Sequence, residues 1–275
     1  MSAGLINFRK VKMATFVSLI SGSSGNATFV SDGKTNLLID CGMSGAKLKE
    51  SLHAIDVMPE SIDALLITHE HVDHTKGAGV ISRRYNIPIY TTQGTHTSMD
   101  IGNIADENIK IITEDTDFEI GNIGIRPFAI PHDATQPVGF NFMIGDEKYS
   151  LATDIGKITK SILEKITGSK KILLESNHDV EMLKCGTYPY PLKRRILGEY
   201  GHLSNETASK VALHLVQNGT EHIMLGHLSK ENNRPEIAML ETYNLLSQSG
   251  VDVGKDMTLQ VADRYKPTYF KRRKI

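Results

Sequence analysis

The sequence predicts an α/β fold in which two β-sheets are covered by helices. Short apolar runs of strand length recur along the chain, and segments with helical periodicity come between them. The runs fall into two similar halves. No Pro/Gly-rich linker or low-complexity block divides the 275 residues. We therefore expect one domain over residues 13–265, preceded by a loose extension (1–12) and followed by a basic tail (266–275).

The first half begins with strands that are separated by turn signals. Polar turn residues fill 21–26, and Asp32-Gly33-Lys34 marks a second turn. The predicted strands are short apolar or β-branched runs at 15–20, 27–30, 36–39, 64–68 and 87–90. Apolar residues at helical spacing predict helices over 44–56 and 73–85.

The second half repeats this pattern with more strands. Its predicted strands are 110–112, 118–120, 123–126, 128–130, 139–143, 149–152, 171–174 and 222–225. Helices are expected over 158–166, 204–218 and 234–248. Ser204 or Asn205 can bond the first free amides of the second of these helices, and Glu206 favours its positive end.

Composition excludes several classes of protein. The formal net charge of −1 provides no global field for binding nucleic acid or membrane, although 266–275 is a local basic segment whose alternative interpretation is a solvated tail. Two cysteines do not make a disulfide framework. The apolar run 14–20 is too short for a signal peptide, and no run approaches the roughly 18 apolar residues that cross a bilayer. These observations predict a cytoplasmic protein without a membrane segment.

A cluster of histidines and carboxylates follows the strand predicted over 64–68. His69, His71 and His74 alternate there with Glu70 and Asp73. Neutral nitrogen and anionic oxygen donors are typical ligands of divalent metals. The cluster predicts a metal site, and metal sites of this kind usually serve hydrolysis.

Five predicted strands end in a residue of this type. The residues at these ends are Asp40, His69, His132, Asp154 and His227. In α/β folds the carboxyl ends of strands often gather at one edge, where ligands bind. We therefore expect the five residues to meet at one site.

The spacing of the donors divides them between two metals. His69 and His71 are two residues apart and point the same way in extended backbone, so they can share one ion with His132. Asp73 and His74 lie beyond the bend and can serve a second ion.

The remaining donors complete this arrangement. Asp154 could bridge the two ions, and His227 would complete the second site. Asp40 is better placed to fix a histidine tautomer, its alternative being a turn carboxylate at a strand end. Nitrogen and oxygen donors without thiolate suit Zn, Mn, Fe or Ni.

The motif His-x-His-x-Asp-His, with Asp40 upstream and three donors downstream, resembles the metallo-β-lactamase superfamily over roughly residues 14–250. The resemblance implies a four-layer αββα sandwich with a two-metal site at the edge between its sheets. It assigns the first metal to His69, His71 and His132. It assigns the second to Asp73, His74 and His227, with Asp154 bridging.

Three further segments, 22–27, 174–179 and 201–207, resemble the phosphodiesterase branch related to ribonuclease Z, and within it the YycJ (WalJ) type of exonuclease. This resemblance implies an enzyme that degrades DNA from the 5′ end. Asp73 and His202 are the expected catalytic residues, His202 as a proton donor to the leaving oxygen beside a phosphate-binding helix start. The expected substrate contacts are Ser23, Ser24, Asn26, His178, Ser204 and Asn205.

The expected reaction is hydrolysis of a phosphodiester by a water that two metals activate. The sequence leaves three alternatives open: hydrolysis of a thioester, lactone or β-lactam, a di-iron oxidoreductase, and a non-catalytic metal-binding scaffold. The di-iron group carries Glu where this chain has His71. His202 could be a capping-region histidine, His178 a loop residue, and 21–26 a simple hairpin turn. Metal identity, DNA against RNA, and oligomeric state are not fixed by the sequence.

Overall fold

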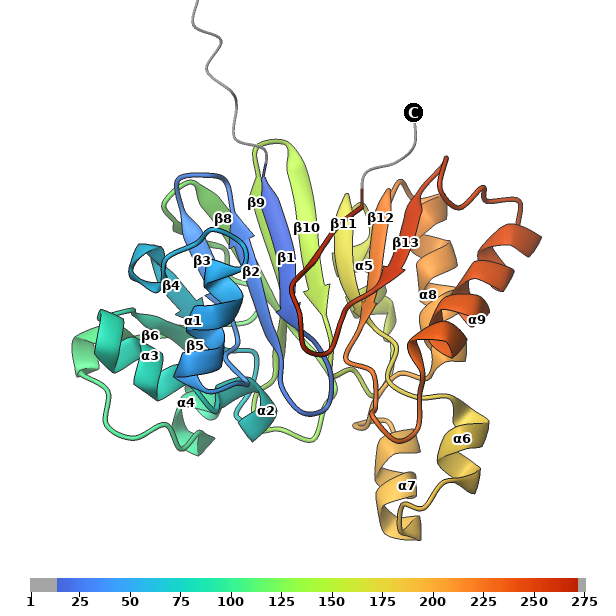
Figure 1. Cartoon of the computed structure of the whole chain (residues 1–275), viewed down its shortest axis with the longest axis horizontal. Helices are drawn as coiled ribbons and strands as arrows, with labels where there is room; N and C mark the ends of the chain where they lie inside the picture. Colours follow the sequence, from blue (N-terminus) through green and yellow to red (C-terminus); the bar gives the residue numbers. More distant parts are fainter. Residues whose placement is uncertain (1–13, 272–275) are drawn as a thin grey trace, which may run out of the picture.

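The computed structural model describes residues 14–271, which form two seven-stranded sheets with helices on their outer faces (Figure 1). The predicted extension 1–12 and the last four residues of the predicted tail lie outside the described residues. The two-sheet α/β fold expected from the sequence is confirmed.

The first sheet has the order β14-β1-β2-β3-β4-β5-β6. Its strands are β1 (Thr15–Ile20), β2 (Ala27–Ser31), β3 (Asn36–Ile39), β4 (Ala64–Leu66), β5 (Ile89–Thr92), β6 (Ile109–Ile112) and β14 (Thr268–Tyr269). The pairs from β14 to β3 are antiparallel, and those from β3 to β6 are parallel. Its helical segments are α1 (Gly45–His53), η1 (Pro59–Ser61), α2 (Val72–Thr75), α3 (Ala78–Tyr85), α4 (Gln93–Ser98) and η2 (Asp106–Asn108).

The second sheet mirrors the first, with the order β13-β12-β11-β10-β9-β8-β7. Its strands are β7 (Phe118–Ile120), β8 (Ile123–Ala129), β9 (Val138–Ile144), β10 (Glu147–Ala152), β11 (Lys171–Glu175), β12 (His222–Gly226) and β13 (Thr258–Val261). Strands β10 to β13 pair in parallel. The helices that follow are α5 (Lys160–Ile166), α6 (Val180–Cys185), α7 (Tyr190–Leu197), α8 (Asn205–Gln217) and α9 (Pro235–Gln248).

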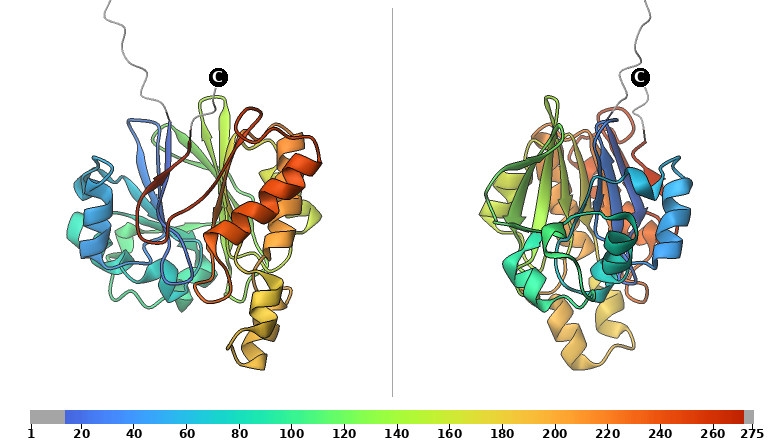
Figure 2. Two further views of the ribbon diagram at one scale, coloured as in Figure 1. Left: turned by 45° about the vertical axis from the view of Figure 1, so that its right-hand side comes forward. Right: turned by 90° about the vertical axis from the view of Figure 1, so that its left-hand side faces the viewer.

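Alternating side chains create the four layers, because successive residues of a strand face opposite sides. In β3, Leu37 and Ile39 enter the apolar cluster between the sheets, whereas Leu38 packs outward with residues of α1 and α3. In β11, Leu173 points inward and Leu174 packs with α5, α8 and α9. Figure 2 shows the helices outside the paired sheets. Both strands are apolar on both faces, which explains their unbroken hydrophobic runs.

Several predicted boundaries were wrong. The helix expected over 73–85 is two helices, because the amide of Gly77 donates to the Cys41 carbonyl oxygen at 2.8 Å and not to the Asp73 carbonyl oxygen within the helix. The strands expected at 123–126 and 128–130 form one strand, β8. Helices α4, α6 and α7 and strand β13 were not predicted. Part of the expected tail is strand β14, which pairs with β1 through Val17 and Tyr269.

Three candidate site residues lie just after the ends of strands, where the chain leaves the sheet. Asp40 follows β3, and Asp154 and His227 follow shortly after β10 and β12. Their φ angles are +59°, +59° and +54°, in the left-handed region that side chains rarely adopt. Such backbone conformations concentrate at functional sites, where the surrounding structure enforces them. Helices α6 and α7 project beyond the sheets at the lower right of Figure 1.

Candidate metal centre

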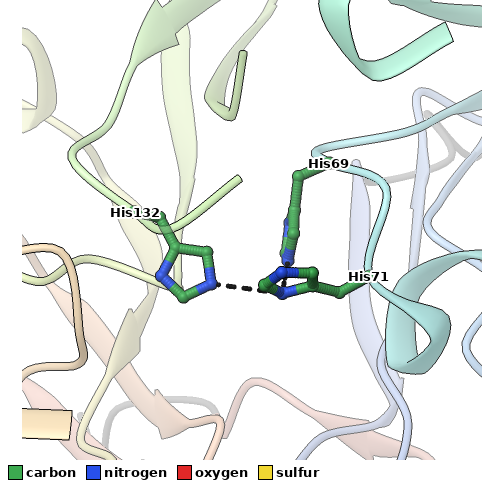
Figure 3. Close-up of side chains that lie close together, drawn as sticks. All are labelled: His69, His71 and His132. Atoms are coloured by element: carbon green, nitrogen blue, oxygen red, sulfur yellow. Dashed lines mark hydrogen bonds between the residues drawn. The ribbon is translucent and has the colours of Figure 1, made fainter. Parts of the chain in front are cut away.

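Three histidine nitrogens converge at the first donor set. His71 Nδ1 lies 3.1 Å from His69 Nε2 and 3.4 Å from His132 Nε2 (Figure 3). A tetrahedral metal with nitrogen ligands at about 2.0–2.1 Å separates those ligands by roughly 3.4 Å. The three nitrogens therefore have the spacing that one shared cation requires.

Contacts with neighbouring groups determine which ring nitrogen of His69 and of His132 is available to a metal. His132 Nδ1 donates to the carbonyl oxygen of Gly201 at 3.1 Å, and His69 Nδ1 lies 3.0 Å from Thr68 Oγ1. In each ring the nitrogen on the far side points at the shared position, as in metal sites whose histidines are held by outer partners. Burial lowers the pKa of both His69 and His132, which favours the neutral imidazole that binds metal.

The second donor set combines Asp73, His74 and His227. Asp73 Oδ2 lies 3.5 Å from both His74 Nε2 and His227 Nε2. His74 Nδ1 donates to Asp40 Oδ2 at 2.8 Å, and His227 Nδ1 donates to a carboxylate of β11, Glu175, at 2.9 Å. Each ring is thus oriented by a carboxylate behind it and presents Nε2 to the site.

Asp154 lies between the two sets. Its Oδ2 atom is 3.5 Å from His74 Nε2, and donor atoms of Asp154, His69 and His74 all lie within 4.8 Å of one another. Among residues 14–271, Asp154 Oδ2 and His227 Nε2 are buried and have no hydrogen-bond partner. Unpaired buried polar atoms are costly, so such atoms in a native site call for a ligand. The donor set fits divalent metal.

Neighbouring carboxylates raise the pKa of two histidines in the second set, whereas burial lowers the pKa of two histidines in the first. Burial alone would lower the pKa of His227, but Asp154, Asp73 and Glu175 raise it to about 10. The pKa of His74 is likewise raised well above its usual value, because Asp154, Asp40 and Asp73 outweigh its burial. Protons and metal cations compete for these nitrogens, so the same negative charge that holds the protons also attracts cations.

Glu175 is a functional residue that the sequence analysis missed. It is fully buried and accepts four hydrogen bonds: from His202 Nδ1 (2.8 Å), His227 Nδ1 (2.9 Å), Ile155 N (2.8 Å) and Leu203 N (3.0 Å). Although burial would raise the pKa of Glu175, the two histidines and these bonds hold it below its usual value. The signal was present, since β11 is a sixth apolar strand that ends in a potential donor.

His202 lies at the rim of a pocket beside the donor sets. The pocket has a volume of about 280 Å³, and helix α7 contributes Leu192 and Arg195 to its wall. Ser23, Asn177 and Ser229 also line it, so its surface combines polar side chains with the apolar ones of α7. The side chain of His202 is 20% exposed, and its bond to Glu175 leaves Nε2 free.

Two of the predicted substrate contacts are open to solvent. Ser23 and Ser24 are exposed, and they line two adjoining pockets. Ser204 is the N-cap of α8, as predicted, and its side chain accepts from the amide of Thr207 at 3.2 Å. The hydroxyl oxygen of Ser204 therefore already accepts a hydrogen bond within the helix start.

The other three predicted substrate contacts have different surroundings from those expected. Asn205 is 1% exposed and bonds to Ser176 and Asn233. Asn26 bonds to the Gly22 carbonyl oxygen, and its Nδ2 lies 3.1 Å from His74 Nε2, so it supports the position of His74. His178 is 1% exposed, and burial lowers its pKa to about 4. These three side chains are buried, so they are not open to a substrate.

No helix among residues 14–271 is long and apolar enough to span a membrane.

Comparisons with known proteins identify the family. Residues 35–227 match the model of the β-lactamase superfamily domain. Exodeoxyribonuclease WalJ of Streptococcus pneumoniae is 39% identical over 242 residues, which cover 86% of this chain and 90% of that protein. Exodeoxyribonuclease YycJ of Bacillus anthracis is 36% identical over 255 residues, covering 92% and 97%.

Solved structures share the fold. Unliganded yeast PDE1 superposes with a TM-score of 0.67 at 14% identity, covering 94% of this chain and 100% of that one. The protein YhfI from Bacillus subtilis gives a TM-score of 0.66 at 16% identity, with 93% and 99% covered. The matched domain, the two mirrored sheets and the clustered donors agree, and the chain belongs to the β-lactamase superfamily.

Proposed function

We propose that this protein is a metal-dependent exodeoxyribonuclease that hydrolyses DNA from the 5′ end with two divalent cations. The observation that carries the proposal is the convergence of two donor sets on the unpaired oxygen of Asp154, beside the Glu175–His202 pair. The names of the two relatives with 39% and 36% identity support DNA as the substrate.

His69, His71 and His132 would hold one ion, and Asp73, His74 and His227 the other, with Asp154 shared. Divalent cations at such a site lower the pKa of water and neutralise charge on a phosphate group. The oxygen and nitrogen donors suit Zn, Mn, Fe or Ni. The protein's own part is to orient each imidazole so that its other ring nitrogen faces the ion, through Asp40, Glu175 and the Gly201 carbonyl oxygen.

His202 would transfer a proton to the leaving oxygen of the cleaved ester. Its Nδ1–H is engaged by Glu175 at 2.8 Å, so the ring is fixed and Nε2 is the nitrogen that exchanges a proton. General acid catalysis of this kind contributes about 10²–10⁴-fold to a rate.

The side chains that line the pocket favour a phosphodiester substrate over a small apolar ester. Its wall combines Ser, Asn, Asp, Arg and His side chains with Tyr188, Leu192 and Ile196, so it offers partners for both the polar groups and the base of a nucleotide. Specific pockets for apolar ligands are lined mostly by hydrophobic and aromatic side chains. Helix α7 forms one wall of the pocket, which opens to solvent beside the donor sets and so suits the end of a strand.

The test uses the purified protein loaded with Mn or Zn and a 5′-phosphorylated DNA strand. We expect the wild type to release nucleotides from the 5′ end, and His71→Ala and Asp73→Ala to be inactive because each removes a metal ligand. RNA, bis-p-nitrophenyl phosphate and a thioester serve as comparison substrates. Turnover of the thioester without turnover of any phosphodiester would overturn the proposal.

A further inference from the structure

A second pocket, of about 250 Å³, lies next to the one that His202 lines. Residues far apart in the sequence form it: Ser24 after β1, Lys47 in α1, Lys76 between α2 and α3, and the pair Arg264 and Tyr265 between β13 and β14. The loop Gly22–Gly25 separates the two pockets, because Ser23 lines the first and Ser24 the second.

The second pocket is cationic. Lys47, Lys76 and Arg264 line it, and no Asp or Glu does. Lys47 pairs with Glu50 at 3.1 Å. In the part of the chain that the structure describes, neither Lys76 nor Arg264 forms an ion pair with a carboxylate. Positive charge without a protein counter-ion attracts anions.

Arg264 is held in place rather than free to leave the pocket. Its Nη2 donates to the Leu228 carbonyl oxygen at 2.7 Å. Its Nη1 is buried without a hydrogen-bond partner among residues 14–271 and lies where a Cβ on Gly22 would be only 2.5 Å away. The charge of the guanidinium is therefore fixed under the Gly22–Gly25 loop, and side-chain order of this kind reduces the entropy lost on binding.

The pocket adjoins the second donor set. Gly42 lines it, and a Cβ on Gly42 would lie 1.7 Å from the carbonyl oxygen of Asp73. The amide of Asn26 donates to that same oxygen at 2.8 Å, and Lys76 follows His74 by two residues. The His202 pocket and the cationic pocket thus lie beside the metal centre, on either side of the Gly22–Gly25 loop.

We infer that the cationic pocket binds the backbone of single-stranded DNA beyond the bond that is cut. This inference rests on the proposed function and names a subsite for it. Lys76 contacts a backbone phosphate of the strand, and Arg264 adds fixed positive charge beneath it. Tyr265, which is 60% exposed, stacks against a base. Exposed aromatic rings beside cationic grooves are the usual means of binding single strands, since every base offers a π-face.

The first experiment compares Lys76→Ala with Lys49→Ala. Lys49 is an exposed lysine of α1 that does not line the pocket, so each variant loses one exposed positive charge. Turnover of 5′-phosphorylated single strands of two and of ten nucleotides is measured with metal-loaded protein. We expect Lys76→Ala to raise KM for the longer strand about fivefold, and to make log(kcat/KM) fall less steeply with log salt, by about 0.7.

The second experiment tests the stacking contact. Tyr265→Ala is expected to raise KM for the longer strand about tenfold, and Tyr265→Phe, which keeps the ring, to restore the wild-type value. Both side chains, Lys76 and Tyr265, are exposed, so the variants are expected to fold.

The outcomes separate this inference from the proposed function. If the wild type degrades DNA while Lys76→Ala matches Lys49→Ala at both lengths and Tyr265→Ala matches Tyr265→Phe, the subsite is refuted and the proposed function stands. If no DNA is degraded by the wild type under any metal, the proposed function falls and this subsite with it.

Discussion

Asp40 and Asp154 occupy equivalent places in the two halves of the molecule but do different things. Each follows the strand at which its sheet changes from antiparallel to parallel pairing, and each has a φ of +59°. Asp40 accepts hydrogen bonds from Thr68 N, Thr68 Oγ1 and His74 Nδ1, so both of its oxygens are used. Asp154 keeps Oδ2 buried and without a partner among the described residues.

The comparison teaches how to tell a ligand from a residue that orients one. A buried carboxylate whose oxygens are all bonded has no acceptor left for a cation, whereas a buried oxygen without a partner is costly unless something binds it. The first half of the chain therefore uses its strand-end carboxylate to orient a histidine, and the second half leaves an oxygen of its carboxylate available, as the proposed metal site requires.

The largest expected effect is that of Asp154→Asn. The substitution replaces one carboxylate oxygen with an amide nitrogen at the position shared by both donor sets. We expect metal affinity to fall by more than the roughly 100-fold that marks the upper range for an outer partner, and nuclease activity to vanish. Elemental analysis after dialysis measures the metal. Full metal retention in this variant would contradict the assigned difference between the two aspartates.

The second prediction separates a loss of catalysis from a loss of metal binding, at a residue in the second half of the chain. His202→Ala removes the proton donor but no metal ligand, so kcat should fall about 10²–10⁴-fold with metal content unchanged. A single-turnover assay beside elemental analysis tests this. An unchanged kcat would assign His202 to the helix start alone, and loss of metal would place it among the ligands.

The third prediction concerns Asp40, the aspartate whose two oxygens both accept hydrogen bonds. Asp40→Asn keeps an oxygen for one donor but turns an NH₂ group towards Thr68 or His74, so His74 loses its fixed orientation. We expect metal affinity to fall about 10–100-fold, less than for Asp154→Asn. Metal titration of the two variants side by side measures the ratio. Equal losses of metal affinity in the two variants would contradict the different roles assigned to Asp40 and Asp154.

The smallest effect concerns the residue beside Asp40. Burial raises the pKa of the Cys41 thiol to about 12, so at pH 8 it is protonated and unreactive, whereas Cys185 is exposed. We expect iodoacetamide to modify one cysteine per folded chain at pH 8, and two in denaturant. Peptide mass spectrometry identifies the modified site. Rapid modification of Cys41 would mean that the strand end at Asp40 opens in solution.

The sequence was enough to predict the paired sheets and the donors at the strand ends. Apolar runs that end in a polar donor are visible without coordinates, and Asp40, His132 and Asp154 were found in that way. Glu175 was missed because it was grouped with the loop after its strand, although the run Ile172–Leu174 before it has the same pattern.

Features set by distant contacts were not predictable from local patterns. The helix break at Gly77 follows from the hydrogen bond of its amide to Cys41, which lies after β3, far earlier in the sequence. Strand β14 exists through its pairing with β1 at the other end of the chain. Asn26 looked like a turn residue open to substrate, and only the fold brings it against Asp73 and His74.

The most direct test of the two-cation centre is anomalous diffraction from a crystal loaded with Mn. Two peaks should appear, one bounded by the imidazoles of His69, His71 and His132 and one by Asp73, His74 and His227, with Asp154 between them. A single peak, or peaks away from these side chains, would contradict the centre on which the proposed chemistry depends.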